Sequence, residues 1–593
     1  MVDETRVRGG PKPKSRAIVR VKTGCKTCRS RKIKCDETKP ACRKCVLTGR
    51  TCDGYGIWDR GNRQTRSTAP GLSISIYNTH TGATSQLSDF EKRQFEWFMR
   101  RTTIKLTGVF HSGFWQSLVL QMSSTEPAVL HAMLALASAH EIELNGTTIE
   151  EHRPLDQGTR ECNILRHYNK SIALLNTNLS SQNPTSIRAA IASCILFVCV
   201  EFVRRRFETG YAHLRSGLKL LEQLPRPSKD ADSEVCPPPD ALVEALLRLD
   251  VQTRLVKTAA LQNAKLSAQI PRLDITVLTS FVSLDGARQQ LDTILSAVYE
   301  LQERARRQTP EDNVSHAFEL LSAQQRLKND LSVWLQTFNR VKGSWWTNLS
   351  SKEKVAYHLI PIYHTMAQII VDTTLQPANE SIYDKHLRQF ESIISLSQSL
   401  LTFALPMMVE EMAYGLHPGF NFTADMGIIP PLYFLGLKCR NPYIRRQAIG
   451  VLATDEHQEG IWDAPLAAAI ASEVMRLEEA NFYDDLFSKS CDAASTAPKK
   501  RKSGTPVPPI LPENCRVRDI QVHLPDGAAD DLIMNGKSMR SNGSLESFTR
   551  RFNVKDKIWQ SGFGWPTSAS SQLPPSSDSS KASYSLDIGL DFF

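Results

Sequence analysis

The chain contains 593 residues, 41% of them hydrophobic, which is enough for several domains or for one large helical domain with tails. Its formal net charge of +10 is concentrated at one end, because residues 1–66 contain 19 Lys and Arg against 6 Asp and Glu. Such a basic end favours a polyanionic partner, most often nucleic acid. The chain does not begin with the apolar segment of a secretory signal. Its best candidate for a membrane span, 189–200, is shorter than the roughly 20 residues required, so the sequence predicts neither a secreted nor a membrane protein.

The basic N-terminal arm, residues 1–22, contains Gly and Pro and few large apolar residues, so we expect it to be disordered. It either contributes phosphate contacts and part of a nuclear import signal, or is a solvated charged arm.

Six cysteines follow the arm within 28 residues, in two similar halves. In a reducing compartment such a cluster favours a metal site over disulfides. One zinc ion would leave two of the thiolates unused, whereas two zinc ions need eight ligand positions, which six sulfurs fill only if two of them bridge both metals. The sequence therefore predicts a binuclear centre of two Zn²⁺ ions. Its ligands are Cys25, Cys28, Cys35, Cys42, Cys45 and Cys52.

The surrounding charge suits both the metal centre and nucleic acid. Two zinc ions and six thiolates sum to −2, which neighbouring Lys and Arg side chains help to neutralise, and the surplus is available for phosphates. A segment of this size with hardly any apolar side chains has no core of its own. The metal must therefore supply most of its folding free energy.

The stretch CRSRKIKCD and the complete cysteine pattern resemble the Zn2Cys6 binuclear-cluster DNA-binding domain of fungal transcription factors, here at 23–54. The resemblance implies that each half is a short helix with a turn, that Cys25 and Cys42 bridge the two metals, and that Pro40 lies in the loop between the halves. It also implies that Arg31 and Lys32 contact bases of a CGG triplet in double-stranded DNA, as Arg and Lys can donate to guanine O6 and N7. The expected phosphate contacts are Lys26, Arg29, Lys34, Arg43 and Lys44. A zinc module that binds protein instead is the alternative.

Residues 55–86 form a linker rich in Gly, Ser, Thr and Asn. The linker lacks the heptad pattern of a coiled coil, through which many relatives dimerise. We therefore expect a monomer, or a dimer formed through the helical domain.

Residues 87–490 have helical periodicity. Ser88 to Glu91 has the form of a capping box, and Pro127 begins an apolar helical stretch, 126–141. With β-type alternation scarce, the fold class is all-α, a large helical domain joined to the small zinc module. Stretches such as AVLHAMLALASAHE and GYAHLRSGLKLLEQL loosely resemble the helical regulatory domain of the same fungal factors, which implies a role in modulating activity.

The helical region contains no common catalytic or nucleotide-binding motif, so the sequence predicts a protein that is not an enzyme. His131 and His140 are interpreted as packed or surface histidines rather than ligands. Trp345 and Trp346 either stack on a ligand or anchor a loop to the core.

The tail, residues 491–593, is expected to be mostly disordered. The basic run Lys499, Lys500, Arg501 and Lys502 fits a nuclear import signal, with chance solvated charge as the alternative. Residues 584–593 alternate acidic and apolar side chains, which is the composition of a segment that binds a coactivator. The alternative is that this apolar end packs against the helical domain.

Together these features predict a nuclear, zinc-dependent, sequence-specific regulator of RNA polymerase II transcription from a fungus, an activator controlling a metabolic or secondary-metabolite gene set. Two other classes remain open. One is an interaction protein whose zinc module binds protein or RNA, and the other is a helical enzyme with an accessory zinc module.

Overall fold

In the computed structural model, the chain forms two units, Met1–Asn78 and Thr79–Phe593, which are described separately. The residues described in the first unit are 25, 27–28, 31–36, 38, 42–46 and 48. Those described in the second unit are 87–146, 154–179, 183–224, 240–256, 280–307, 314–346, 349–413, 422–454, 456–484, 486, 508–527, 530–540 and 542–560. The N-terminal arm 1–22, the linker up to residue 86, the basic run at 499–502 and the segment 584–593 lie outside the described residues.

The described part of the first unit is small and consists mainly of turns. Thr27 and Cys28 belong to a helical turn, in which the N–H of Arg31 donates to the carbonyl of Thr27 at 3.2 Å. The second half contains the short helix α2 (Arg43–Val46). Two short helical turns agree with the expected arrangement of two similar halves.

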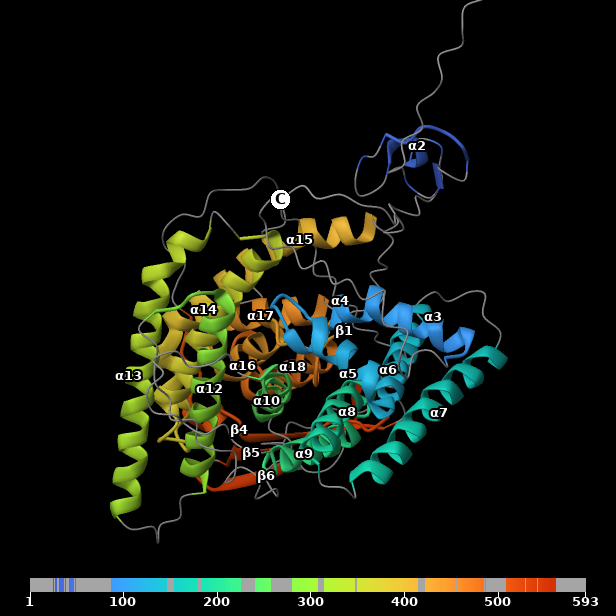
Figure 1. Ribbon diagram of the computed structural model, residues 1–593. Coiled ribbons are helices and arrows are strands. Elements are labelled where there is room, and N and C mark those ends of the chain that lie inside the picture. Colours follow the sequence, from blue (N-terminus) through green and yellow to red (C-terminus); the bar gives the residue numbers. More distant parts are fainter. Residues whose placement is uncertain are drawn as a thin grey trace, which may run out of the picture. The chain divides into compact units, whose positions relative to one another are not determined.

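The second unit is dominated by helices between residues 87 and 486 (Figure 1), as the all-α fold class predicts. In chain order they are α3 (Asp89–Trp97), η2 (Phe98–Thr102), α4 (Thr103–Leu106), η3 (Phe114–Leu118), α5 (Val119–Thr125), α6 (Pro127–Gly146), α7 (Pro154–Leu179), α8 (Pro184–Val203), α9 (Phe207–Leu221), α10 (Ala241–Leu255), α12 (Leu284–Arg306), α13 (Val314–Trp345), α14 (Ser351–Thr373), η6 (Glu380–His386), α15 (Leu387–Ala413), α16 (Ile429–Lys438), α17 (Pro442–Thr454) and α18 (Ala464–Glu479).

Several of these helices begin where the sequence places a start signal. Ser88 accepts a hydrogen bond from the Glu91 N–H, and the Glu91 carboxylate accepts one from the Ser88 N–H, so the predicted capping box is confirmed. Helix α6 begins at Pro127 as predicted. A second capping box, Ser350 with Glu353, begins α14.

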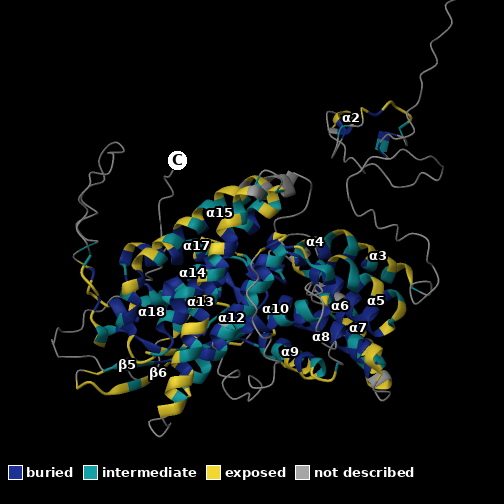
Figure 2. Cartoon of the chain, turned by 60° about the vertical axis from the view of Figure 1, so that its left-hand side comes forward, coloured by how far each residue is buried: buried dark blue, intermediate teal, exposed yellow. Residues whose placement is uncertain are grey.

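The core lies between pairs of neighbouring helices. Helix α6 packs against α7 and α8, α8 packs against α9, and α12 packs against α13 and α14. Figure 2 shows buried residues on the faces that these helices turn toward one another and exposed residues on the outside. The central helix α8 is buried on all sides rather than on one stripe. With 20 residues it is longer than the apolar run 189–200 suggested, and by length and composition it could cross a membrane. Because 89% of its most apolar window is buried inside the protein, we identify it as a core helix.

A small sheet fixes the start of α16. Strand β2 (Gln458–Glu459) pairs with β1 (Phe422–Thr423) and with β3 (Trp462–Asp463). The buried carboxylate of Glu459 accepts the backbone N–H groups of Gly427, Ile428 and Ile429 at 2.7–3.2 Å. These N–H groups would otherwise be unpaired, since they precede or begin α16.

The C-terminal part differs from the mostly disordered tail that we expect at 491–593. Residues 508–560 fold into η8 (Glu513–Cys515) and an antiparallel sheet of β4 (Arg518–His523), β5 (Leu532–Met539), β6 (Leu545–Asn553) and β7 (Ile558–Gln560), in that order across the sheet. Alternate residues in the first part of β5 are buried, whereas β4 and β6 each have two buried residues that are four positions apart. The buried apolar side chains include Val522, Leu532, Met534, Phe548 and Phe552. This segment is ordered because it covers apolar surface of the helical unit.

Polar contacts also hold the sheet to the helices. Thr209 in α9 donates its N–H and its hydroxyl to the Asp526 carboxylate at 3.0 and 2.9 Å. The N–H of Val517 donates to Glu478 of α18 at 2.9 Å. The sheet is therefore an integral part of the second unit.

Candidate metal centre and nucleic-acid interface

The cysteine side chains of the first unit form its only buried cluster among the described residues. Cys25 Sγ lies 3.6 Å from Cys42 Sγ and 3.8 Å from Cys45 Sγ, and Cys28 Sγ lies 3.5 and 3.8 Å from the same two sulfurs. Sulfurs bound to one tetrahedral zinc at about 2.3 Å would lie about 3.8 Å apart. The sulfur separations therefore fit zinc ligation, and Cys35 completes a group of four with Cys25, Cys28 and Cys42 whose sulfurs all lie within 4.8 Å.

The two halves repeat the same local hydrogen bond. The N–H of Cys28 donates to Cys25 Sγ at 3.3 Å, and the N–H of Cys45 donates to Cys42 Sγ, also at 3.3 Å. An N–H donor stabilises a thiolate, so both C-x2-C pairs are preorganised for a cation. Cys25 and Cys42 thus occupy equivalent positions, as the expected bridging pair requires. Cys52 and Pro40 lie outside the described residues.

Burial makes the thiol cluster dependent on metal. Desolvation by burial raises the pKa of the Cys28 and Cys42 thiols above the ordinary value, because burial is unfavourable for the charged thiolate. Bound Zn²⁺ supplies the missing positive charge and deprotonates its ligands. The cysteines present are therefore suited to zinc.

Polar side chains join the first half of the module to helix α2. Asp36 Oδ2 accepts hydrogen bonds from Thr38 Oγ1 at 2.9 Å and from the Arg43 N–H at 3.0 Å, and Thr38 Oγ1 accepts from the same N–H at 3.1 Å. The carboxylate lies at the start of α2, whose N–H groups need acceptors. Asp36 is the last residue of the stretch CRSRKIKCD, and that pattern alone does not predict its capping role.

The predicted DNA-contacting side chains that the structure describes lie around the thiols. Lys32, Lys34, Arg43 and Lys44 are exposed. Arg31 is partly buried, and its Nη1 donates to Thr48 Oγ1 at 3.3 Å. Lys32 has a φ of 54°, the left-handed conformation that ends a helical turn. The remaining two predicted phosphate contacts, Lys26 and Arg29, lie outside the described residues.

The two histidines singled out in the helical region are packed in the core. His140 Nδ1 lies 2.7 Å from Thr102 Oγ1, and His131 Nδ1 lies 3.1 Å from His167 Nδ1. Glu91 lies close to the His131–His167 pair, so that the donor atoms of all three are within 4.8 Å. Burial lowers the pKa of His131 to about 4, so the pair is neutral at pH 7 and one ring donates to the other. Because Glu91 also accepts the capping hydrogen bonds from Ser88, this group has a structural role.

Trp346 packs against the start of α14, and Trp345 packs against its own helix, α13. The ring of Trp346 lies 5.2 Å from that of Tyr357 and 5.7 Å from that of His358, and Lys354 Nζ lies 5.5 Å from its centroid. Trp345 lies 6.2 Å from Phe338 in an edge-to-face arrangement. These contacts agree with the anchoring role rather than with ligand stacking.

A basic module built on clustered thiols and a large helical domain together define a zinc-dependent DNA-binding regulator of transcription. The chain belongs to the fungal Zn(2)-Cys(6) binuclear-cluster transcription factors. Residues 23–60 match the fungal Zn(2)-Cys(6) binuclear cluster domain, which binds two zinc ions, and residues 95–407, more than half of the chain, match the fungal specific transcription factor domain.

Three relatives illustrate the similarity. The aspercryptin biosynthesis cluster-specific transcription regulator atnN of Emericella nidulans is 23% identical over 79% of this chain and 89% of its own length. The transcription regulator lscL of Purpureocillium lilacinum is 30% identical over 35% of this chain and 51% of its own. The transcriptional regulatory protein moc3 of Schizosaccharomyces pombe is 62% identical over 45 residues, 8% of each chain. No solved structure matches the chain. Transcription regulators of this kind normally act in the nucleus.

Proposed function

We propose that the protein is a nuclear activator of RNA polymerase II transcription that recognises CGG-like triplets in double-stranded DNA and controls a secondary-metabolite gene set. The observation that carries the DNA-binding part is the arrangement of the first unit, in which buried thiols are surrounded by exposed basic side chains. Such a module combines a metal-stabilised scaffold with charge suited to a phosphate backbone.

The six cysteines Cys25, Cys28, Cys35, Cys42, Cys45 and Cys52 bind the two zinc ions in this proposal, with Cys25 and Cys42 bridging. The short sulfur separations and the equivalent N–H···S bonds of Cys25 and Cys42 support it. Exposed Cys162 and the buried thiols of the helical unit are not part of the centre.

Arg31 and Lys32 contact bases, while Lys34, Arg43 and Lys44, with Lys26 and Arg29, contact phosphates. Arg31 and Lys32 end the first helical turn, where two neighbouring cationic side chains can meet the edge of one base pair step. The exposed positions of Lys34, Arg43 and Lys44 suit phosphate contacts, which fix orientation without selecting sequence.

The choice of a secondary-metabolite gene set is supported by the relative from Emericella nidulans, which is described as specific to a biosynthetic cluster. The proposal also includes nuclear import through Lys499, Lys500, Arg501 and Lys502, and coactivator binding through 584–593. The protein is either a monomer or a dimer formed through the helical unit. These last assignments are supported by sequence composition.

The test is selection from random duplex DNA by the zinc-loaded protein, followed by affinity measurements on the selected and a scrambled duplex. Arg31→Ala and Lys32→Ala should reduce the preference for the selected site about 5- to 100-fold, as expected for a lost base contact. Lys34→Ala and Arg43→Ala are the matched controls. They should weaken binding to both duplexes equally, and each should lower the slope of log affinity against log salt by about 0.9.

An unenriched DNA pool despite two bound zinc ions would contradict specific recognition and would favour the interaction-protein alternative. Equal losses of preference for all four variants would contradict the division between base and phosphate contacts.

A further inference from the structure

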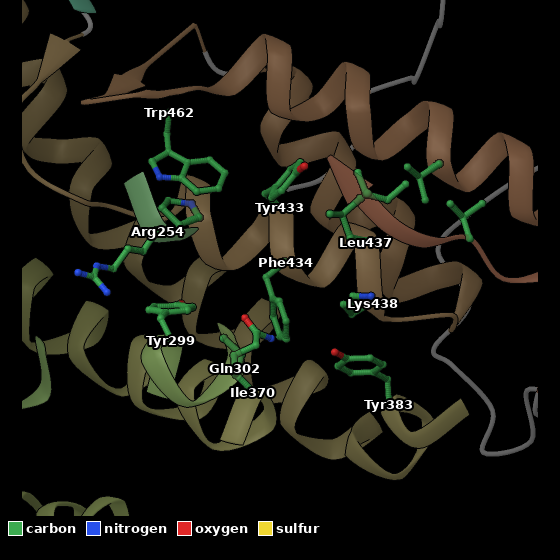
Figure 3. A pocket seen from close by; sticks show the side chains of 14 residues that line it. Arg254, Tyr299, Gln302, Ile370, Tyr383, Tyr433, Phe434, Leu437, Lys438 and Trp462 are labelled. Atoms are coloured by element: carbon green, nitrogen blue, oxygen red, sulfur yellow. The ribbon is translucent and has the colours of Figure 1, made fainter. Parts of the chain in front are cut away.

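The second unit contains a cavity of about 70 Å³ where helices α10, α12 and α16 meet strands β3 and β4. By the same measure one water occupies roughly 10–15 Å³, so the cavity can hold more than a single water. Figure 3 shows Trp462 and Tyr383 at opposite ends, Phe434 between them, and Tyr299 and Gln302 on one side.

The walls are mainly aromatic and aliphatic. Tyr433 and Trp462 meet edge to face with centroids 5.2 Å apart, and Tyr383 and Phe434 do so at 6.3 Å. Aliphatic side chains from α14, α16, α18 and the C-terminal sheet complete the lining, namely Ile370, Leu437, Val474, Val517 and Ile520. Such a surface binds a flat apolar molecule better than water.

Both cationic side chains in the lining are already neutralised. Arg254 Nε lies 2.7 Å from Asp250 Oδ2, and Lys438 Nζ lies 2.6 Å from Glu380 Oε1. Lys438 also lies over the ring of Tyr383, 4.9 Å from its centroid. An ionic ligand would find no uncompensated charge here, so the lining selects against anions and cations alike.

Two polar groups on one face of α12 remain available. The hydroxyl of Tyr299, whose side chain is only 4% exposed, has no hydrogen-bond partner among the described residues. Gln302 follows three residues later, and its amide lies beside the ring of Phe434 in Figure 3. An unpaired buried hydroxyl is unfavourable, and a ligand oxygen would satisfy it.

We propose that this cavity binds an uncharged aromatic small molecule carrying a hydroxyl or carbonyl group, with the rings of Trp462, Tyr433 and Phe434 holding its flat surface and Tyr299 and Gln302 binding its oxygen. The occupant would contact helix α16 and strand β4 together, so it links the helices to the C-terminal sheet. This inference does not rest on the DNA-recognition proposal and is tested without DNA.

The probe is 2-naphthol, which is flat, uncharged and carries one hydroxyl, titrated into the full-length zinc-loaded protein while tryptophan fluorescence and the thermal unfolding midpoint are followed. We expect saturable one-to-one binding, a higher midpoint at saturation, and at least tenfold weaker binding of naphthalene-2-sulfonate, whose charge has no partner in the cavity.

Tyr299→Phe keeps the ring and removes only the hydroxyl, so it should weaken 2-naphthol binding about 5- to 10-fold. Val474→Phe should abolish binding by filling the cavity. Tyr443→Phe, at a position 43% exposed on α17, is the matched control and should leave the affinity unchanged. The midpoint without ligand shows that each variant is folded.

Absence of saturable 2-naphthol binding by the folded wild-type protein would overturn the proposal, because water alone would then fill the cavity. An affinity that neither Tyr299→Phe nor Val474→Phe changes would place the bound probe elsewhere and would overturn it equally.

Discussion

The two units of the protein are stabilised in different ways. Among the described residues, the buried cluster of the first unit consists of five cysteines and nothing else. The second unit buries a continuous apolar core that extends from Phe98 in η2 to Phe552 in β6. The first fold therefore depends on a ligand, the metal, whereas the second depends on the burial of apolar surface.

Buried charge shows the same difference. In the second unit, the buried side chains of Arg440 and Arg445 both bind the Glu478 carboxylate at 2.7 Å. Arg440 also binds Glu380 at 3.0 Å and Arg445 lies 3.5 Å from Glu479, so the charges compensate one another within the chain. In the first unit, several thiolates are crowded together, and a bound cation would compensate their charge. Removal of metal should therefore unfold the first unit and leave the second folded. Mutations in the apolar core should destabilise the second unit and leave the first unchanged.

Metal removal should have the largest effect. A strong chelator, or Cys28→Ala, should unfold the first unit and reduce specific DNA binding at least about 100-fold, because the metal supplies most of the folding free energy of this unit. Zinc content, DNA affinity and the thermal unfolding of the helices are measured on the same sample. The helical unfolding transition should not change.

The matched control for that experiment is Cys194→Ala in the core helix α8. Burial raises the pKa of the Cys194 thiol to about 12, so this side chain stays protonated and does not bind zinc. Its replacement should change neither zinc content nor DNA affinity. Loss of helical structure on chelation would contradict the independence of the two units.

Trp334→Ala in α13 should destabilise the second unit without affecting the first. Trp334 is fully buried, stacks on Phe338 and His364, and donates its Nε1–H to the Ala287 carbonyl at 3.0 Å. Its removal should lower the free energy of unfolding of the second unit by about 3–5 kcal/mol. Urea unfolding followed by circular dichroism measures the loss, and zinc content should stay at two ions per chain.

Phe318→Ala is the control on the same helix, because Phe318 is 71% exposed. It should change the free energy of unfolding by less than about 0.5 kcal/mol. A similar loss of unfolding free energy in Trp334→Ala and Phe318→Ala would contradict the placement of Trp334 in the core.

The features that sequence could predict are those encoded locally. The spacing of the cysteines from Cys25 to Cys52 defines a metal site without any knowledge of the fold, and the capping box at Ser88 and the helix start at Pro127 depend on contacts within four residues. The apolar periodicity of the helices is likewise a local property. None of these local signals depends on the tertiary structure of the rest of the chain.

The features that sequence could not predict depend on distant residues. The cavity is lined by residues from Arg254 to Ile520, which only the complete fold brings together. The C-terminal strands carry many polar side chains, as in LESFTRRFN at 545–553, so their few buried apolar positions do not stand out from a polar tail. The strands are held against α9 and α18, which lie far earlier in the sequence, α9 much farther than α18.

Arg516 tests whether the C-terminal sheet belongs to the second unit. Only 1% exposed, it binds Asp384 of η6 at 2.7 and 2.9 Å and donates to the Glu380 carbonyl at 3.0 Å. Arg516→Ala should cost about 2 kcal/mol, less than a fully buried pair, because Asp384 is 28% exposed. The measurement is urea unfolding of the second unit in the wild type and in Arg516→Ala. The variant should unfold in one transition, at a lower urea concentration than the wild type.

Arg540→Ala is the matched control for the ion pair, since Arg540 is 51% exposed and binds Glu546 on the outer part of the same sheet. The loss should be at most about 1 kcal/mol. A second transition in Arg516→Ala that reports only β-structure would mean that the sheet unfolds separately, which would contradict its place in the core.

The smallest effect concerns acid. Burial lowers the pKa of His364 from its ordinary 6.5 to about 4, although the hydrogen bond from Nε2 to the Leu331 carbonyl at 2.9 Å partly offsets this. Between these two values the unfolded chain binds the proton more readily than the folded one. The contribution to stability is therefore complete above pH 6.5 and is lost as the pH falls toward 4.

Between pH 7 and pH 5 the loss from His364 should be about 1–2 kcal/mol, and His364→Gln should remove that part of the pH dependence. Urea unfolding at both pH values, with chelator present throughout, restricts the measurement to the second unit, because zinc release from the first also follows acid. His111→Gln, at an exposed position, is the control and should keep the wild-type slope. An identical pH dependence in wild type and His364→Gln would mean that the buried ring is not what makes the helical unit sensitive to acid. Acid sensitivity would then arise from other buried histidines such as His131, whose pKa burial lowers to about 4.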